Sequence, residues 1–278
     1  GAAITDTATV TFTVGAADPT NGNTTLVAAP TSVVADGSTT SSVTVTLADA
    51  SGNLLTASGG TVALSSTGSA TIGAVTDNGD GTYTATVTNT VAESVTISGT
   101  LDGAAITDTA TVTFTVGAAD PTNGNTTLVA APTSVVADGS TTSSVTVTLA
   151  DASGNLLTAS GGTVALSSTG SATIGAVTDN GDGTYTATVT NTVAESVTIS
   201  GTLDGAAITD TATVTFTVGA ADPTNGNTTL VAAPTSVVAD GSTTSSVTVT
   251  LADASGNLLT ASGGTVALSS TGSATSGP

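Results

Sequence analysis

A single text of 102 residues is written almost three times along this chain, and this repetition constrains the fold more than any other feature. Residues 1–102 recur without a change as residues 103–204, and the same text begins again at Gly205 and continues through Thr275. The chain then reads Ser276-Gly277-Pro278, where the repeat would give isoleucine next. Each copy is large enough to bury a core of its own, so we expect a tandem array of equal domains.

Within one copy, small polar and apolar residues alternate, which predicts β-strands with one buried face. Helical spacing of apolar residues is not evident in the sequence. Asp108 falls on the inward parity of its strand, which predicts a bulge or a strand end at that position. The alternating or apolar runs are residues 26–28, 42–47, 62–64, 82–87, 95–97 and 110–116.

Turn signals rich in Gly, Asp, Asn and Ser separate these runs. The turn at residues 77–81 is predicted to close a hairpin, because Asn-Gly and Asp-Gly supply the positive φ values of a tight β-turn. About seven antiparallel strands in about 100 residues are typical of an all-β sandwich. The other turn signals are residues 35–38, 49–53 and 58–60.

The composition excludes several classes of partner. The chain has 20 Asp and Glu and no Lys, Arg or His, so its formal net charge is −20. Nucleic acid and anionic membranes bind proteins through basic side chains, so neither is expected as a partner. A hydrophobic content of 38% indicates a folded core rather than disorder. No apolar run approaches the length of a membrane span, and we expect no membrane insertion in this part of the protein.

The residue types also argue against an enzyme. Ser and Thr nucleophiles have no His or Lys to activate them, and no cation is present to hold a phosphate or to polarise an oxyanion. Residues 49–53 show the first ligand spacings of a calcium-binding loop. However, Leu54 stands where such a loop has glycine, and Gly60 stands where it has glutamate. We therefore interpret residues 49–53 as a polar turn.

Four segments together carry a family resemblance: residues 30–37, 43–47, 49–53 and 77–83. Their order and sequence resemble the bacterial immunoglobulin-like repeats of the intimin and invasin adhesins. The resemblance implies tandem immunoglobulin-like Greek-key β-sandwiches arranged as an extended rod, on the outside of a bacterial cell. Because its motifs are turns and strands, it specifies the fold more closely than the function.

The resemblance also sets the domain limits. It implies that residues 1–16 are the final strand of a preceding repeat, that 19–116 and 121–218 are complete domains, and that 223–278 are an incomplete domain holding only the first strands. The linker at residues 117–120 is short and ends before proline, so we expect a semi-rigid joint.

Each domain start carries one aspartate next to proline: Asp18, Asp120 and Asp222. Calcium often ties linker carboxylates and carbonyl oxygens together in acidic extracellular arrays, which makes these residues candidate calcium ligands. Against this, a calcium site needs six to eight oxygens, and an aspartate before proline is first of all a turn residue. A plain turn is the interpretation that we favour.

Two functions fit these features. In the family, such repeats are mostly spacers, so we expect a structural extender, or stalk, that projects a distal binding domain away from the cell. The alternative is that the repeats themselves form a multivalent adhesive module for sugar, ice or homotypic binding, because threonines line one face of residues 107–115. Threonine is also simply a good solvent-facing strand former.

The expected partners are neighbouring repeats of the same protein. Residues 1–16 carry one apolar face, and residues 223–278 lack the counterparts of residues 83–87 and 95–101. We expect the start of one chain to lie close to residues 223–278 of a neighbour, through head-to-tail strand addition between chains or because a longer array continues directly.

Overall fold

The computed structural model describes residues 1–275 and contains strands, turns and irregular segments. Over these residues no helix is formed, so none could cross a membrane. The all-β class predicted from the alternating pattern is confirmed.

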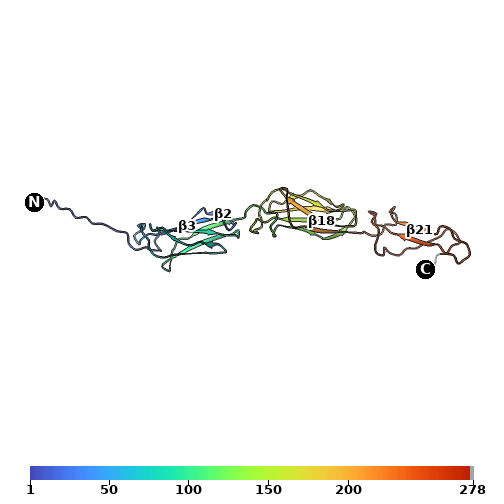
Figure 1. Cartoon of the computed structure of the whole chain (residues 1–278), viewed down its shortest axis with the longest axis horizontal. Coiled ribbons are helices and arrows are strands. Elements are labelled where there is room, and N and C mark those ends of the chain that lie inside the picture. Colours follow the sequence, from blue (N-terminus) through green and yellow to red (C-terminus); the bar gives the residue numbers. More distant parts are fainter. Residues whose placement is uncertain (276–278) are drawn as a thin grey trace. The chain divides into compact units, whose positions relative to one another are not determined.

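The first sandwich consists of two five-stranded sheets (Figure 1). One sheet has the order β1-β3-β7-β5, with β6 also paired to β7, and the other has the order β2-β10-β8-β4, with β9 paired to β8. Of the strands labelled in Figure 1, β3 belongs to the first of these sheets and β2 to the second. The strands are β1 (Thr25–Ala29), β2 (Ser32–Val34), β3 (Ser41–Thr46), β4 (Val62–Ser66), β5 (Thr71–Ile72), β6 (Thr76–Asp77), β7 (Thr82–Thr88), β8 (Ser94–Leu101), β9 (Ala104–Ala105) and β10 (Ala110–Thr115).

The second sandwich repeats this topology, with the orders β11-β13-β17-β15 and β12-β20-β18-β14. In the third copy β21 pairs with β22 in an antiparallel ladder. The strands are β11 (Thr127–Ala131), β12 (Ser134–Val136), β13 (Ser143–Thr148), β14 (Val164–Ser168), β15 (Thr173–Ile174), β16 (Thr178–Asp179), β17 (Thr184–Thr190), β18 (Ser196–Leu203), β19 (Ala206–Ala207), β20 (Ala212–Thr217), β21 (Thr229–Ala233) and β22 (Ser246–Thr250).

The core lies between the two sheets and follows from the alternation in the sequence. In β3 and β10 every second side chain is buried, and the intervening side chains face outward. Both aromatic rings of the first sandwich are buried, and aliphatic side chains fill the rest of the space between the sheets. The larger members of this core are Leu26, Val43, Val45, Leu47, Tyr83, Val87, Val95, Ile97, Val112 and Phe114.

The turns fall where the sequence predicts them. β6 and β7 form a hairpin across residues 77–82, closed by a hydrogen bond from the Asn78 N–H to the Thr82 carbonyl (3.0 Å). Gly79 and Gly81 adopt φ values of 78° and 87° there, which confirms the predicted turn chemistry. Asp108 lies just before β10, so the predicted strand end is also confirmed, and its carboxylate accepts a hydrogen bond from the Leu26 N–H (2.9 Å).

The estimate of about seven strands per copy is too low, because each sandwich has ten. The additional strands include β5, β6 and β9, each of two residues. A two-residue segment is too short to show an alternating pattern. β6 and β9 are joined to their partners β7 and β8 by short turns, whereas β5 pairs with the far end of β7.

The chain divides into two compact units. The first unit contains Gly1–Asn123 and Ala150–Leu156, and the second contains Gly124–Leu149 and the chain from Leu157 onward. The strands of the two sandwiches lie inside the predicted limits 19–116 and 121–218. Those limits and the extended rod stay predictions, and the predicted segment 223–278 includes three residues outside the described ones.

Two segments leave apolar side chains in solvent. Residues 1–14 form no strand among the described residues, and Ile4 and Phe12 are 91% and 93% exposed. In the third copy, Leu230 and Val247 are 62% and 42% exposed. Strand addition between chains therefore remains a prediction for these two surfaces.

Candidate functional site

A buried aspartate begins the same loop in all three copies. Asp49, Asp151 and Asp253 expose 4%, 2% and 2% of their surfaces, although the side chain is fully charged at neutral pH. We call residues 49–53, 151–155 and 253–257 the aspartate loops. A buried carboxylate is stable only when donors surround it, so its partners define what the loop does.

Backbone and carboxamide groups of the loop itself supply most of the donors. In the first copy, one carboxylate oxygen of Asp49 accepts hydrogen bonds from the N–H groups of Ser51 and Asn53, both at 2.9 Å. The Asn53 Nδ2 lies 3.2 and 3.0 Å from the two oxygens, and the Gly15 N–H donates to Oδ2 at 2.8 Å. The interpretation of residues 49–53 as a polar turn is confirmed.

These donors keep the carboxylates ionised. The Asn53 carboxamide, followed by the Gly15 and Asn53 N–H groups, lowers the pKa of Asp49 to about 2. At Asp253, burial raises the pKa, but the hydrogen bonds from Gly219 and Asn257 outweigh it and hold the pKa below its usual range.

In the second unit, the aspartate loop also bonds to the second sandwich. The Gly219 N–H, just after β20, donates to the Asp253 Oδ2 at 2.9 Å. The Asn257 Oδ1 accepts from the Ala194 N–H at 2.8 Å, and its Nδ2 donates to the Thr192 carbonyl at 2.9 Å. Thr192 and Ala194 lie in the turn between β17 and β18.

The same bonds recur inside the first unit. The Gly117 N–H donates to Asp151 Oδ2 at 2.8 Å, and the Asn155 carboxamide bonds the Ala92 N–H (2.9 Å) and the Thr90 carbonyl (3.0 Å). In the first copy the Asn53 carboxamide bonds only Asp49 among the described residues. The equivalent asparagine is therefore seen both bonded to the turn of a preceding sandwich, as in Asn155, and bonded only to its own aspartate, as in Asn53.

The candidate calcium ligands are placed one per copy, each at its own turn. The Asp18 carboxylate accepts from the Thr20 N–H (2.9 Å) and hydroxyl (2.8 Å), which together lower its pKa. Asp120 and Asp222 make the same bonds to Thr122 and Thr224. Over residues 1–275 no group of three or more His, Cys, Asp or Glu is arranged to hold a metal ion. Calcium binding by these residues remains a prediction.

Sequence reasoning predicted the polar turn at residues 49–53 but neither the burial of its aspartate nor the role of its asparagine. The turn that Asn257 binds lies 63 and 65 positions earlier in the chain. No spacing rule connects residues that far apart. The three identical copies gave no signal either, because Asn53, Asn155 and Asn257 have the same neighbours in the sequence.

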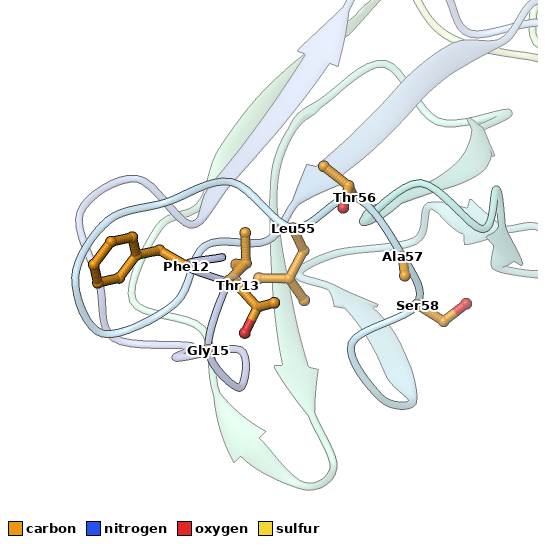
Figure 2. A pocket seen from close by; sticks show the side chains of 8 residues that line it. Phe12, Thr13, Gly15, Leu55, Thr56, Ala57 and Ser58 are labelled. Atoms are coloured by element: carbon orange, nitrogen blue, oxygen red, sulfur yellow. The ribbon is translucent and has the colours of Figure 1, made fainter. Parts of the chain in front are cut away.

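A hollow in the first unit includes Gly15, whose N–H donates to Asp49 of the first aspartate loop (Figure 2). The Phe12 ring points away from Leu55, and the hydroxyl groups of Thr13, Thr56 and Ser58 are the polar side-chain groups of the lining. None of the residues that line it is ionisable, so no side chain there can act as a general acid or base at neutral pH. Its lining is Phe12, Thr13, Val14, Gly15, Leu55, Thr56, Ala57 and Ser58.

The two-sheet sandwiches and the aspartate loops filled by the chain's own donors define a class of protein: tandem immunoglobulin-like domains. The family model described as invasin, domain 3, matches residues 20–117, 122–219 and 224–278. The chain therefore belongs to the invasin domain 3 family of bacterial adhesin domains, as the resemblance predicted. These relatives are adhesin domains rather than enzymes.

Solved structures show the same relationship. InvD of Yersinia pseudotuberculosis is 31% identical, with a TM-score of 0.55, and the match covers 85% of this chain and 72% of InvD. The adhesin FdeC of Escherichia coli is 29% identical, with a TM-score of 0.55 and coverage of 88% and 77%.

Invasin, described as a bacterial integrin-binding protein, is 29% identical, with a TM-score of 0.51 and coverage of 76% of this chain. The chain spans only 43% of that invasin structure. A search of the curated proteins finds none that matches the chain.

Proposed function

We propose that this chain is a structural extender of a bacterial surface adhesin, which projects a distal binding domain away from the cell. Its partners are then neighbouring repeats of the same protein, and its location is extracellular. The family membership supports an adhesin, and the features of the copies themselves support the role of a stalk within it.

The observation that carries this proposal is that the chain's own hydrogen-bond donors surround the carboxylate of each aspartate loop. Asp49, Asp151 and Asp253 are the buried acidic side chains of the described residues, and a buried carboxylate surrounded by donors is a kind of group often found at ligand sites. Here the donors are Gly219, Ser255 and Asn257, all of which belong to the chain. Their hydrogen bonds join parts of the array and leave the carboxylate buried.

The surfaces of the copies offer little else for a specific receptor. Binding hot spots are enriched in exposed aromatic side chains and arginine. The chain has no arginine, and over the described residues Phe12 is the one exposed aromatic ring. The aromatic residues within the two sandwiches, Tyr83, Phe114, Tyr185 and Phe216, are all buried. Because the copies have identical sequences, no copy carries residues that would distinguish it as a receptor site.

A second function, multivalent adhesion by the repeats, is favoured by one observation. Threonines at every second position of residues 107–115 are exposed, and the same row recurs at residues 209–217. Weak contacts to such rows add up when many identical copies engage one surface.

Binding assays separate the two functions. The chain, immobilised at one end, is presented with host cells, polysaccharide and ice, alongside chains that carry one or two sandwiches. An extender gives no retention at any copy number. Retention of one of these surfaces that rises steeply with copy number would contradict the extender and support the adhesive module.

A further inference from the structure

The second unit holds the third copy against the second sandwich at two separate places. The first is the exit of β20, where Gly219 donates to Asp253 and the Asp222 N–H donates to the Ala252 carbonyl at 2.7 Å. The second is the turn between β17 and β18, which the Asn257 carboxamide bonds. A tether at one place allows two bodies to pivot, whereas a second contact off that axis removes the pivot.

Both the amide nitrogen and the oxygen of the Asn257 carboxamide are hydrogen-bonded in this arrangement. One of its two N–H groups faces the Asp253 carboxylate, at 3.2 and 3.0 Å from the two oxygens, and the other donates to Thr192. Its oxygen accepts from Ala194. Only Asn and Gln carry both a double donor and an acceptor on one side chain, and Gln is longer by one methylene. The position therefore has a specific chemical requirement.

The loop presents this carboxamide in a fixed orientation before any contact is made. Asp49 and Asn53 in the first copy form the same internal bonds as Asp253 and Asn257, although within residues 1–275 the Asn53 carboxamide contacts no turn of another domain. A group that is already ordered loses little entropy on binding. The buried aspartate is in this sense a positioning residue for the asparagine.

We propose that Asn257 is a latch that fixes the orientation of one copy on the copy before it, and that the joint needs no metal ion. The partner surface is the turn Thr192-Val193-Ala194 that follows Asn191 at the end of the preceding sandwich. Asn155 makes the equivalent bonds inside the first unit. This inference rests on the proposed extender, since it names the contact that would make a stalk stiff.

The chain offers a matched control, because Asn53→Ala removes the same bonds to its aspartate but no bond to the turn of another domain. The absence of cysteine allows two unique spin labels in the full chain, through Ala165→Cys on β14 and Thr248→Cys on β22. Both positions are exposed and lie in the second unit. Pulsed electron double resonance then gives the distribution of distances between the labels.

We expect a narrow distribution in the labelled parent chain and in Asn53→Ala, with or without EDTA. Asn257→Ala is expected to broaden it, with roughly a tenfold rise in the open fraction for the loss of two hydrogen bonds. Asn257→Asp, which lacks the donor for Thr192 and places a second carboxylate beside Asp253, should broaden it as well. Equal melting curves for Asn53→Ala and Asn257→Ala would show that the broadening does not come from unfolding.

The latch is overturned by a narrow distribution in Asn257→Ala or Asn257→Asp, by a broad one in the parent chain, or by broadening with EDTA. These outcomes are independent of the binding assays. A soft joint contradicts the latch and leaves the lack of receptor binding intact, whereas receptor binding contradicts the extender and leaves the latch intact.

Discussion

The first and third copies carry the same residues from the start of the domain to the aspartate loop, yet their side chains meet different surroundings. Leu26 in β1 is 2% exposed, whereas its counterpart Leu230 in β21 is 62% exposed. The strand pairing is nevertheless the same, because Leu26 faces Val45 in one ladder and Leu230 faces Val249 in the other. Local sequence thus specifies the pairing of these two strands and the loop, and burial comes from β7, β8 and β10, far along the chain.

The largest expected effect comes from removing a side chain that is buried in a complete sandwich and exposed in its counterpart. Phe114 in β10 is 2% exposed and Phe12, its counterpart in the first copy, is 93% exposed. We expect Phe114→Ala to lower the free energy of unfolding of the first sandwich by about 3–5 kcal/mol, because it leaves a cavity in the core. Calorimetry of the full chain measures the change.

The matched variant Phe12→Ala tests the surroundings of the exposed segment. If residues 1–16 stay in solvent, Phe12→Ala changes no melting transition at low protein concentration. Strand addition between chains predicts instead that the parent chain associates as its concentration rises, and that Phe12→Ala weakens the association. Sedimentation velocity over a concentration series distinguishes the two outcomes.

A smaller effect is expected at the loop that contains Gly59 and Gly60, which a side chain of β7 holds in place. The third copy has the same loop sequence but, within residues 1–275, no counterpart of β7. The Tyr83 hydroxyl donates to the Gly60 carbonyl at 2.7 Å and accepts from the Gly59 N–H at 3.0 Å. Tyr83→Phe is expected to cost about 1–3 kcal/mol, because it leaves these backbone groups without their partner. Urea unfolding measures the loss, and an unchanged midpoint would show that water replaces the hydroxyl.

Acid is expected to weaken the turns that all three copies share. Hydrogen bonds from Thr39 and Ser38 hold the pKa of Asp36 below its usual range, and those from Asn53 and Gly15 do the same for Asp49. A depressed folded-state pKa gives stability that is present above the unfolded pKa, near 4, and is lost as the pH falls through the folded value. Stability should therefore be flat between about pH 5 and 8 and fall below about pH 4. Urea midpoints across this range test the sign.

The smallest expected effect concerns calcium. With Asp18, Asp120 and Asp222 acting as turn residues, addition of calcium or a chelator should leave the melting temperature unchanged. A drop in melting temperature with chelator, absent in the triple substitution of these aspartates by asparagine, would instead establish them as calcium ligands.

The comparison also explains how much of this molecule its sequence predicts. Strands such as β3 and β10, the turn at residues 77–81 and the strand end at Asp108 follow from alternation and turn chemistry, which act over a few residues. The aspartate loop follows for the same reason. The strands β6 and β9 are joined to their partners by short turns, but two residues are too few to show alternation. The pairing of β5 and the partner of Asn257 depend on segments brought together only by the fold, so no local pattern predicts them.

The central claim is that successive copies extend the protein in a fixed direction, and its most direct test is the length of chains with two, three, four and six copies. Small-angle X-ray scattering gives the maximum dimension of each. The account predicts a linear rise of about 40 Å per copy, because the eight residues of β8 span about 26 Å at roughly 3.3 Å per residue and the turns and the linker add the rest. A rise with the square root of the copy number, or a dimension that stays nearly constant, would contradict it.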